Sequence, residues 1–500
     1  MPGVTRLTTM ATSTTPIHHR SATELASMIA AREVSSRELL DIFVERIETL
    51  DEAVNAVVTL DLDRARAAAD AADAATAAGT ATGALHGVPI TVKDALAVDG
   101  VRSTGGATEL ADHVATTDAD VVALVRRAGA IPFAKTNVPR WSGDFQTYND
   151  VFGTTNNPWD TTRTPGGSSG GPAAAVALGF GGFELGTDIG GSIRVPAAFN
   201  GICGHKPSFG LVPCGGYIDR VDYGRTEPDI NVHGPLARSI DDLEVLMDLL
   251  AAPRPDRSIA VDHRIPPARH ERIADHRIAV WADHADCPSS ADTRAAVESA
   301  GDILDALGAQ VDRTARPDID ATASAALGLW LVAAATSPSL TDDEYDFYTM
   351  LANSPDTPDD IKRAVSSFTA SPREWFAADD RRARIRESWR EFFGEVDALV
   401  CPVIVTPPFP HLQEGNLTSR TLAIDGVERP YSDLFHWTIL IGMAYLPATV
   451  VPVGTTAGGL PVGVQIVGPY LEDRTPLTVA RALRDELGPI TFPDRPVTPD

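Results

Sequence analysis

The chain is organised around residues 166–207, which read GGSSGGPAAAVALGFGGFELGTDIGGSIRVPAAFNGICGHKP. Two serine clusters lie among glycines here, at residues 166–171 and 188–194. Glycine carries an entropic cost on folding, so dense glycine beside hydroxyl groups indicates that the backbone must approach something closely. Backbone N–H groups that converge on one point bind an anion, and acyl transfer has to stabilise a developing oxyanion. The stretch therefore predicts a serine nucleophile, which still requires a base.

Lysine usage singles out a candidate for that base. Only four of the 42 basic residues are lysine, namely Lys93, Lys135, Lys206 and Lys362. Lysine, unlike arginine, can lose its proton near neutral pH when it is buried. Lys93 ends an apolar, β-rich run in GVPITVKD, residues 87–94. Burial there would lower its pKa and let it accept a proton from a serine. The alternative is a lysine that extends from a strand end into solvent.

Several ordered blocks of the sequence are similar to those of a known family. The blocks GVPITVKD, TPGGSSGG and GTDIGGSIRVPAAFNGICGHKP resemble those of the amidase signature family of Ser–Ser–Lys hydrolases. Further matching blocks lie at residues 234–239, 397–402, 446–449 and 459–468, so the resemblance covers about residues 22–488. One GGSSGG motif would be weak evidence, whereas ordered blocks with a correctly placed lysine are specific.

The resemblance implies a catalytic role for three residues. Ser192 is expected to be the nucleophile and Ser168 a bridging serine after a cis Gly167–Ser168 peptide bond. Lys93, neutral at rest, would draw a proton from Ser192 through Ser168 and return it to the leaving nitrogen. This is acyl transfer through an acyl-enzyme, and it requires no metal or cofactor. The N–H groups expected to bind the oxyanion belong to Ile189, Gly190, Gly191 and Ser192.

Four further residues receive supporting roles. Asp188 and Arg194 bracket Ser192 and are expected to hold its loop through a charge-assisted pair. Ser169 is expected to donate or accept a hydrogen bond beside the catalytic residues. Ser142 falls at a substrate-contact position of the family. A purely structural role is the alternative for Ser169, Asp188 and Arg194.

Other nucleophile motifs fit the sequence less well. GSSGG formally matches G-x-S-x-G, with Ser169 as nucleophile, but that motif follows a buried strand and here it follows the polar segment 159–165. No S-x-x-K motif occurs. Cys203 near His205 suggests a cysteine-dependent amidase only superficially, because a cysteine in an apolar run is usually a small buried residue.

Composition limits the partners. The formal net charge of −26 argues against nucleic acid and anionic membranes, and favours a strongly solvated surface. The four cysteines, Cys203, Cys214, Cys287 and Cys401, show no CxxC pairing and suit a reducing compartment. No apolar run approaches about 18 residues and no signal peptide is evident, so a cytoplasmic location is predicted.

The order of apolar runs predicts an α/β protein. Helices are expected to begin after the capping boxes at residues 21–24 and 35–38 and over residues 61–78, with a strand ending at Lys93. The family fold is α/β/α, with a large mixed, twisted sheet flanked by helices. Residues 1–20 are expected to be a disordered tail and residues 21–500 a single amidase domain. A helical cap insertion is expected at about residues 319–390, whose aromatic residues either line the active-site mouth or pack the insertion's own core.

The function expected from these features is cleavage of a carbon–nitrogen bond in a small or medium amide. Aryl amides, carbamates and esters are alternative substrates, since acyl-enzyme formation requires a carbonyl and not a particular leaving group. The protein is therefore also a urethanase candidate. The expected partner is a small-molecule amide or carbamate, with no nucleic acid and no membrane, and with a homodimer as the assembly considered. The alternative is a non-autonomous component that resembles the A-type subunit of glutamyl-tRNA amidotransferase and passes ammonia to a partner.

Overall fold

The computed structural model describes residues 15–223, 226–415, 417 and 419–499. The fold is centred on a mixed eight-stranded sheet with strand order β10-β9-β11-β15-β14-β7-β8-β6. The first three strands run parallel, and every later pair is antiparallel. In that order the strands are Gln310–Asp312, Arg277–Val280, Ala398–Pro402, Pro461–Val467, Ala448–Thr455, Cys203–Lys206, Val232–Ala237 and Glu184–Asp188. The predicted α/β fold with a large mixed sheet flanked by helices is confirmed.

A smaller sheet carries the lysine strand. Its order is β1 (Val57–Leu60), β3 (Ile131–Thr136) and β2 (Pro89–Lys93), with β2 parallel to β3. All five residues of β2 are buried. Strand β2 packs against β6, so the edges of the two sheets meet at Lys93.

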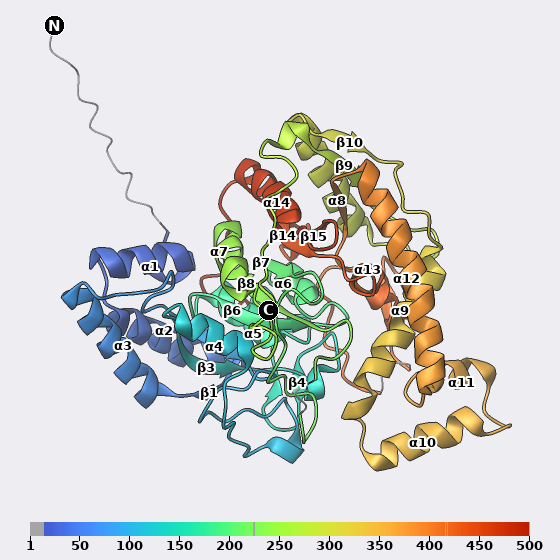
Figure 1. Cartoon of the computed structure of the whole chain (residues 1–500), viewed down its shortest axis with the longest axis horizontal. Coiled ribbons are helices and arrows are strands. Elements are labelled where there is room, and N and C mark those ends of the chain that lie inside the picture. The colour runs from blue at the N-terminus through green and yellow to red at the C-terminus, as the bar shows by residue number, and fades with distance from the viewer. Residues whose placement is uncertain (1–14, 224–225, 416, 418, 500) are drawn as a thin grey trace, which may run out of the picture.

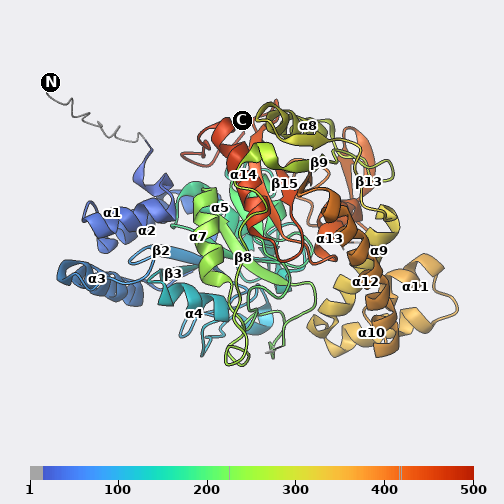
Figure 2. The same cartoon turned by 45° about the horizontal axis from the view of Figure 1, so that its top comes forward.

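The N-terminal helices begin where the capping boxes predict. The Ser21 and Ser35 side chains accept from the third backbone N–H of α1 (Ala22–Ala31) and α2 (Ser36–Leu50), and the glutamate at that position returns the bond. The alanine-rich helix α3 (Leu62–Ala78) also forms as expected. These three helices occupy one end of the molecule (Figures 1 and 2). Of the predicted tail, residues 1–14 lie outside the described residues, and Ile17–His19 form a 3-10 turn with His19 against Phe492.

Two short helices follow the serine clusters and form the centre of the core. Every residue of α5 (Gly170–Leu178) and α6 (Arg194–Asn200) is buried. Apart from α9 to α12, the remaining α-helices of the described residues are α4 (Asp120–Arg127), α7 (Ile240–Leu250), α8 (Ala291–Ala306), α13 (His436–Gly442) and α14 (Arg474–Leu487). Two hairpins complete the elements, β4–β5 (Tyr148–Asn149 and Gly153–Thr154) and β12–β13 (Thr421–Ile424 and Val427–Pro430).

Helices α9 to α12 form a lobe at the end of the molecule opposite α1–α3 (Figures 1 and 2). Their bounds are Ala321–Thr336, Asp342–Asn353, Asp359–Ser366 and Pro372–Glu395. Aromatic residues pack within the lobe, with Tyr348 stacked on Phe368 at 5.0 Å and Trp389 fully buried, while Phe347 is half exposed.

One segment of this lobe departs from the expectation that no apolar run approaches membrane-spanning length. Ala321–Ser339 is long and apolar enough to cross a membrane, by length and composition alone. Helix α9 within it packs against α12 and α13, so part of this apolar surface is covered by the protein itself.

Candidate active site

Three segments of the chain bring the predicted catalytic residues together. Lys93 is the last residue of β2, Ser168 precedes α5, and Ser192 lies in the turn between β6 and α6. Lys93 and Ser168 are fully buried and Ser192 is 6% exposed. The turn between β6 and α6 requires glycine at residue 191, because Gly191 has φ +132° and an added Cβ would meet the Thr438 side chain at 2.8 Å.

The Lys93 amine faces two hydroxyl groups. Its Nζ donates to Ser168 Oγ at 2.7 Å and to Thr187 Oγ1 at 2.8 Å. Burial lowers the pKa of Lys93 to about 7, against the opposing influence of Asp188 and Glu184. A large share of the amine is therefore neutral near pH 7, and it is the neutral amine that can accept a proton.

The two serine clusters touch through the backbone. The peptide bond between Gly167 and Ser168 is cis, as the resemblance implied. The Ser169 N–H donates to the Ser192 carbonyl at 3.2 Å. Between these described residues, no hydrogen bond joins the hydroxyls of Ser168 and Ser192. The geometry therefore supplies the first link of a relay, from Lys93 to Ser168, and leaves the Ser192 hydroxyl unengaged at the surface of the site.

The turn before Ser192 offers fewer oxyanion donors than expected. The Gly191 N–H donates to Asp188 Oδ1 at 2.9 Å, so this group, one of four predicted, is already engaged. The N–H groups of Ile189, Gly190 and Ser192 bond to no other described residue and remain candidates. The Phe435 ring lies beside Gly190, 3.5 Å from where a Cβ would stand, and packs at a tilt of 31° against the Phe145 ring with ring centres 4.2 Å apart.

Asp188 and Arg194 form the predicted pair, and both are fully buried. Arg194 Nη2 and Nε donate to the two Asp188 oxygens at 2.9 and 3.0 Å. Its Nη1 donates to the Thr438 carbonyl at 2.9 Å and to Gln465 Oε1 at 3.3 Å. Burial alone would raise the pKa of Asp188, but the Arg194 guanidinium outweighs it and holds that pKa below its ordinary value. The pair ties the nucleophile turn to α13 and β15.

Replacing Arg194 with alanine is expected to lower the free energy of unfolding by about 3–5 kcal/mol, because it leaves the buried Asp188 carboxylate without its charged partner. Urea unfolding followed by circular dichroism measures this. The matched control is Arg384→Ala, since Arg384 pairs with Asp380 on the surface and its side chain is 74% exposed. That variant should lose less than about 1 kcal/mol. Equal losses in both variants would contradict a structural role for the buried pair.

The remaining predicted residues lie nearby. Ser169 Oγ is 3.5 Å from the Thr187 carbonyl, a weak contact consistent with a supporting role. Ser142 has φ +59°, and its buried hydroxyl lies close to the Tyr217 phenol, which also approaches Thr187. Tyr217 thus connects the substrate-contact candidate with the residue that binds Lys93.

Sequence reasoning missed Thr187, Tyr217 and Glu184. Thr187 stands one residue before Asp188 inside the GTDIGGS block, so its position was a usable signal. Tyr217 lies in an irregular segment far along the chain, and nothing in the sequence indicates that it returns to this site. Glu184 is a fully buried carboxyl at the start of β6, where the sequence shows only an acidic residue among glycines and apolar residues.

The pH dependence of acylation follows from Lys93. The rate of Ser192 modification by phenylmethanesulfonyl fluoride is expected to rise about tenfold per pH unit below pH 7 and to level off above it. The neutral lysine is the reactive form, and acid protonates it near its pKa of about 7. Intact-mass spectrometry of timed samples from pH 5.5 to 8.5 measures this. A rate that is flat across this range would contradict a lysine base.

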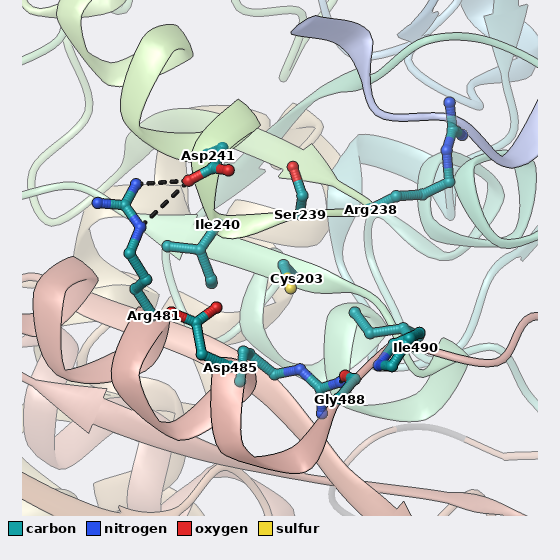
Figure 3. Close-up of a pocket in the computed structure, with 11 residues that line it drawn as sticks. Cys203, Arg238, Ser239, Ile240, Asp241, Arg481, Asp485, Gly488 and Ile490 are labelled. Carbon is teal, nitrogen blue, oxygen red and sulfur yellow. Dashed lines mark hydrogen bonds and ion pairs between the residues drawn. The ribbon is translucent and has the colours of Figure 1, made fainter. Parts of the chain in front are cut away.

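A cavity of about 330 Å³ lies away from this site (Figure 3). Its lining includes Cys203, Arg238 and Arg481, with Arg481 bound to Asp241, and it contains none of the predicted catalytic residues. Burial raises the pKa of the Cys203 thiol to about 12, so this cysteine is not a nucleophile.

Known proteins resemble this protein over most of its length. Residues 38–477 match the family model for Amidase. The A-type subunit of the glutamyl-tRNA(Gln) amidotransferase of Halorhodospira halophila is 34% identical, over 93% of this chain and 96% of that protein. The corresponding subunit of Aromatoleum aromaticum is 35% identical, over 92% and 96%. The solved structure of a bacterial aryl acylamidase of the amidase signature family matches with a TM-score of 0.79 at 25% identity, over 95% of this chain and 97% of that one.

These relatives correct two expectations. The stand-alone amidohydrolase, with its carbamate and ester variants, is the wrong interpretation, because relatives at 34 and 35% identity are subunits of an amidotransferase. The expectation of a lone small-molecule partner without nucleic acid is wrong on the same finding. Net charge averages over a whole surface and carries no information on what a neighbouring protein binds. The relatives favour the alternative, an A-type subunit.

Proposed function

The chain belongs to the amidase family, and we therefore propose that it is the amide-cleaving subunit of a glutamyl-tRNA amidotransferase. It hydrolyses a small amide donor, the side-chain amide of glutamine, and releases ammonia to a partner protein that acts on the tRNA. The observation that carries this proposal is identity of 34–35% to the A-type subunits of two such enzymes over more than nine-tenths of the chain. The aryl acylamidase, by comparison, is 25% identical.

The chemistry assigned to the site is acyl transfer. Ser192 Oγ attacks the amide carbon while its proton passes through Ser168 to neutral Lys93. The proton then moves to the leaving nitrogen, the carbon–nitrogen bond breaks, and ammonia departs from a glutamyl ester of Ser192. Water deprotonated by the same route attacks the ester and releases glutamate.

Charge at the carbonyl oxygen is stabilised by the backbone. The unengaged N–H groups of Ile189, Gly190 and Ser192 are the proposed donors, and Asp188 fixes the turn by accepting from Gly191, Ile193 and Arg194. Ser142, on the turn beside Tyr217, is the proposed substrate contact.

A role within a larger enzyme also bears on the rest of the chain. We propose that residues 21–500 act as one amidase domain with the α9–α12 lobe as its insertion, and that the protein works in the cytoplasm, where tRNA is aminoacylated.

The proposal is tested by ammonia release from glutamine. The purified protein alone is expected to hydrolyse glutamine slowly, and co-expression with the remaining amidotransferase subunits of its own genome should raise kcat at least about tenfold. The complex should also convert Glu-tRNA(Gln) to Gln-tRNA(Gln). Rapid hydrolysis of simple anilides by the protein alone, with no glutamine turnover in the presence of the partners, would overturn it.

A further inference from the structure

Lys93 and Ser192 are held by two different sheets. Strand β2, which ends at Lys93, is an edge of the small sheet, and β6, which leads to Ser192, is an edge of the large one. The two strands pack together but are not paired as neighbours within either sheet. One backbone bond, from the Gly182 N–H to the Pro89 carbonyl at 2.9 Å, joins the two segments where the strands begin. Towards Lys93 no β ladder continues it, so side chains fix the distance between the lysine and the nucleophile turn.

The Glu184 carboxyl spans this junction. Glu184 is the first residue of β6 and is fully buried. Its Oε2 accepts from the hydroxyl of Thr91 on β2 and lies 3.4 Å from the hydroxyl of Thr136 on β3. The backbone N–H of Lys93 also approaches this carboxyl. Thr91 and Lys93 lie two residues apart and so point to the same face of β2.

A second link crosses the junction at its other end. The Lys93 amine donates to Thr187 Oγ1 of β6 at 2.8 Å, the same contact that leaves it beside Ser168. Without the Glu184 contacts, the Lys93 end of β2 would be held to β6 by the catalytic amine itself. We propose that Glu184 is a positioning residue that clamps β2 to β6 and so holds the Lys93 amine within reach of Ser168.

The inference rests on the role of Lys93 in the proposed function. The charged or titratable groups around the carboxyl and the amine are Lys135 with its partner Asp94 at 3.4 Å, Asp188 with its partner Arg194, and His233 of β8. Burial lowers the pKa of His233 to about 3, so it stays neutral near pH 7. Burial raises the pKa of Glu184 to about 8. Glu184 is thus mostly neutral at pH 7, and its ionised form raises the pKa of Lys93.

Three variants test the clamp, with phenylmethanesulfonyl fluoride labelling of Ser192 as the readout. Glu184→Ala removes the bridge and should slow labelling at pH 7.5 at least about tenfold, because small displacements of a catalytic group cost this much or more. Glu184→Gln keeps an acceptor for Thr91 and should label within about threefold of the wild type at pH 7.5. Its labelling midpoint should stay within about half a pH unit of the wild type, because Glu184 is already mostly neutral at pH 7. Thr91→Val removes only the donor and should slow labelling about threefold or more.

Urea unfolding of each variant separates position from stability. Wild-type labelling rates in folded Glu184→Ala and Thr91→Val would overturn the clamp. Slower labelling that the unfolded fraction of each variant fully explains, or a Glu184→Gln rate as slow as that of Glu184→Ala, would overturn it as well. The reagent needs neither glutamine nor a partner protein, so absence of glutaminase activity would refute the proposed function while leaving this result intact.

Discussion

Ser192→Ala is expected to abolish the phenylmethanesulfonyl fluoride adduct and to lower amide hydrolysis by at least about 10³-fold. The Ser192 hydroxyl lies in the glycine-rich turn between β6 and α6. It has no hydrogen-bond partner among the described residues, and Ser192 is 6% exposed. Three N–H groups that bond to no described residue surround it, so an oxyanion formed there would be stabilised. Intact-mass spectrometry and ammonia release from the assembled complex measure the two effects.

Ser169→Ala is the matched control for this experiment. Ser169 stands beside Ser168 and is fully buried, and the one hydrogen bond of its hydroxyl among the described residues is to the Thr187 carbonyl, at 3.5 Å. This variant should keep the single adduct, with a rate reduced by less than about tenfold. An adduct that persists in Ser192→Ala and disappears in Ser169→Ala would move the nucleophile to the first serine cluster and refute the proposed mechanism.

Lys93→Met should reduce the labelling rate by about 10²–10⁴-fold, the usual contribution of a general base. The methionine side chain fits the same buried slot but cannot accept a proton, whereas Lys93→Arg would keep a positive charge at every accessible pH. Both variants should lose the rise in rate near pH 7 that the wild type shows. A neutral and a charged substitution at the same position thus give the same kinetic result if the neutral amine is the base.

Lys362→Arg serves as the lysine control, because Lys362 lies on α11 in the α9–α12 lobe, outside the described catalytic contacts. It should label at the wild-type rate and with the wild-type pH profile. If urea unfolding shows that Lys93→Met is folded, and its labelling rate still has a midpoint near pH 7, then that ionisation belongs to another group.

Local sequence signals predicted much of the framework. The capping boxes at Ser21 and Ser35 fixed two helix starts, since the residues that make the cap are three positions apart and need no distant partner. The scarcity of lysine pointed to Lys93, and burial of a lysine at a strand end was enough to anticipate its lowered pKa. The large mixed sheet followed from the family resemblance rather than from any single strand, because its order joins β14 to β7, which lies more than two hundred residues earlier.

Contacts between distant segments account for what was missed. The Gly191 N–H was expected to bind an oxyanion, but Asp188 lies three residues earlier on a tight turn and takes that donor. Tyr217 approaches Ser142 and Thr187 only because an irregular segment returns to the site. The interpretation as a stand-alone enzyme failed for a different reason, since composition describes average surface properties and not which partner a surface accepts.

Residue chemistry at fixed spacing was enough to specify the glycine-rich serine turns, the single lysine of the β2 strand and the family to which they belong. How the lysine meets the nucleophile turn became visible only in three dimensions. Lys93 ends an edge strand of one sheet and Ser192 follows an edge strand of another, and side-chain contacts of Glu184, Thr91 and Thr187 cross the junction between them. Contacts of that kind depend on where strands pack in space, which no local pattern of residues encodes.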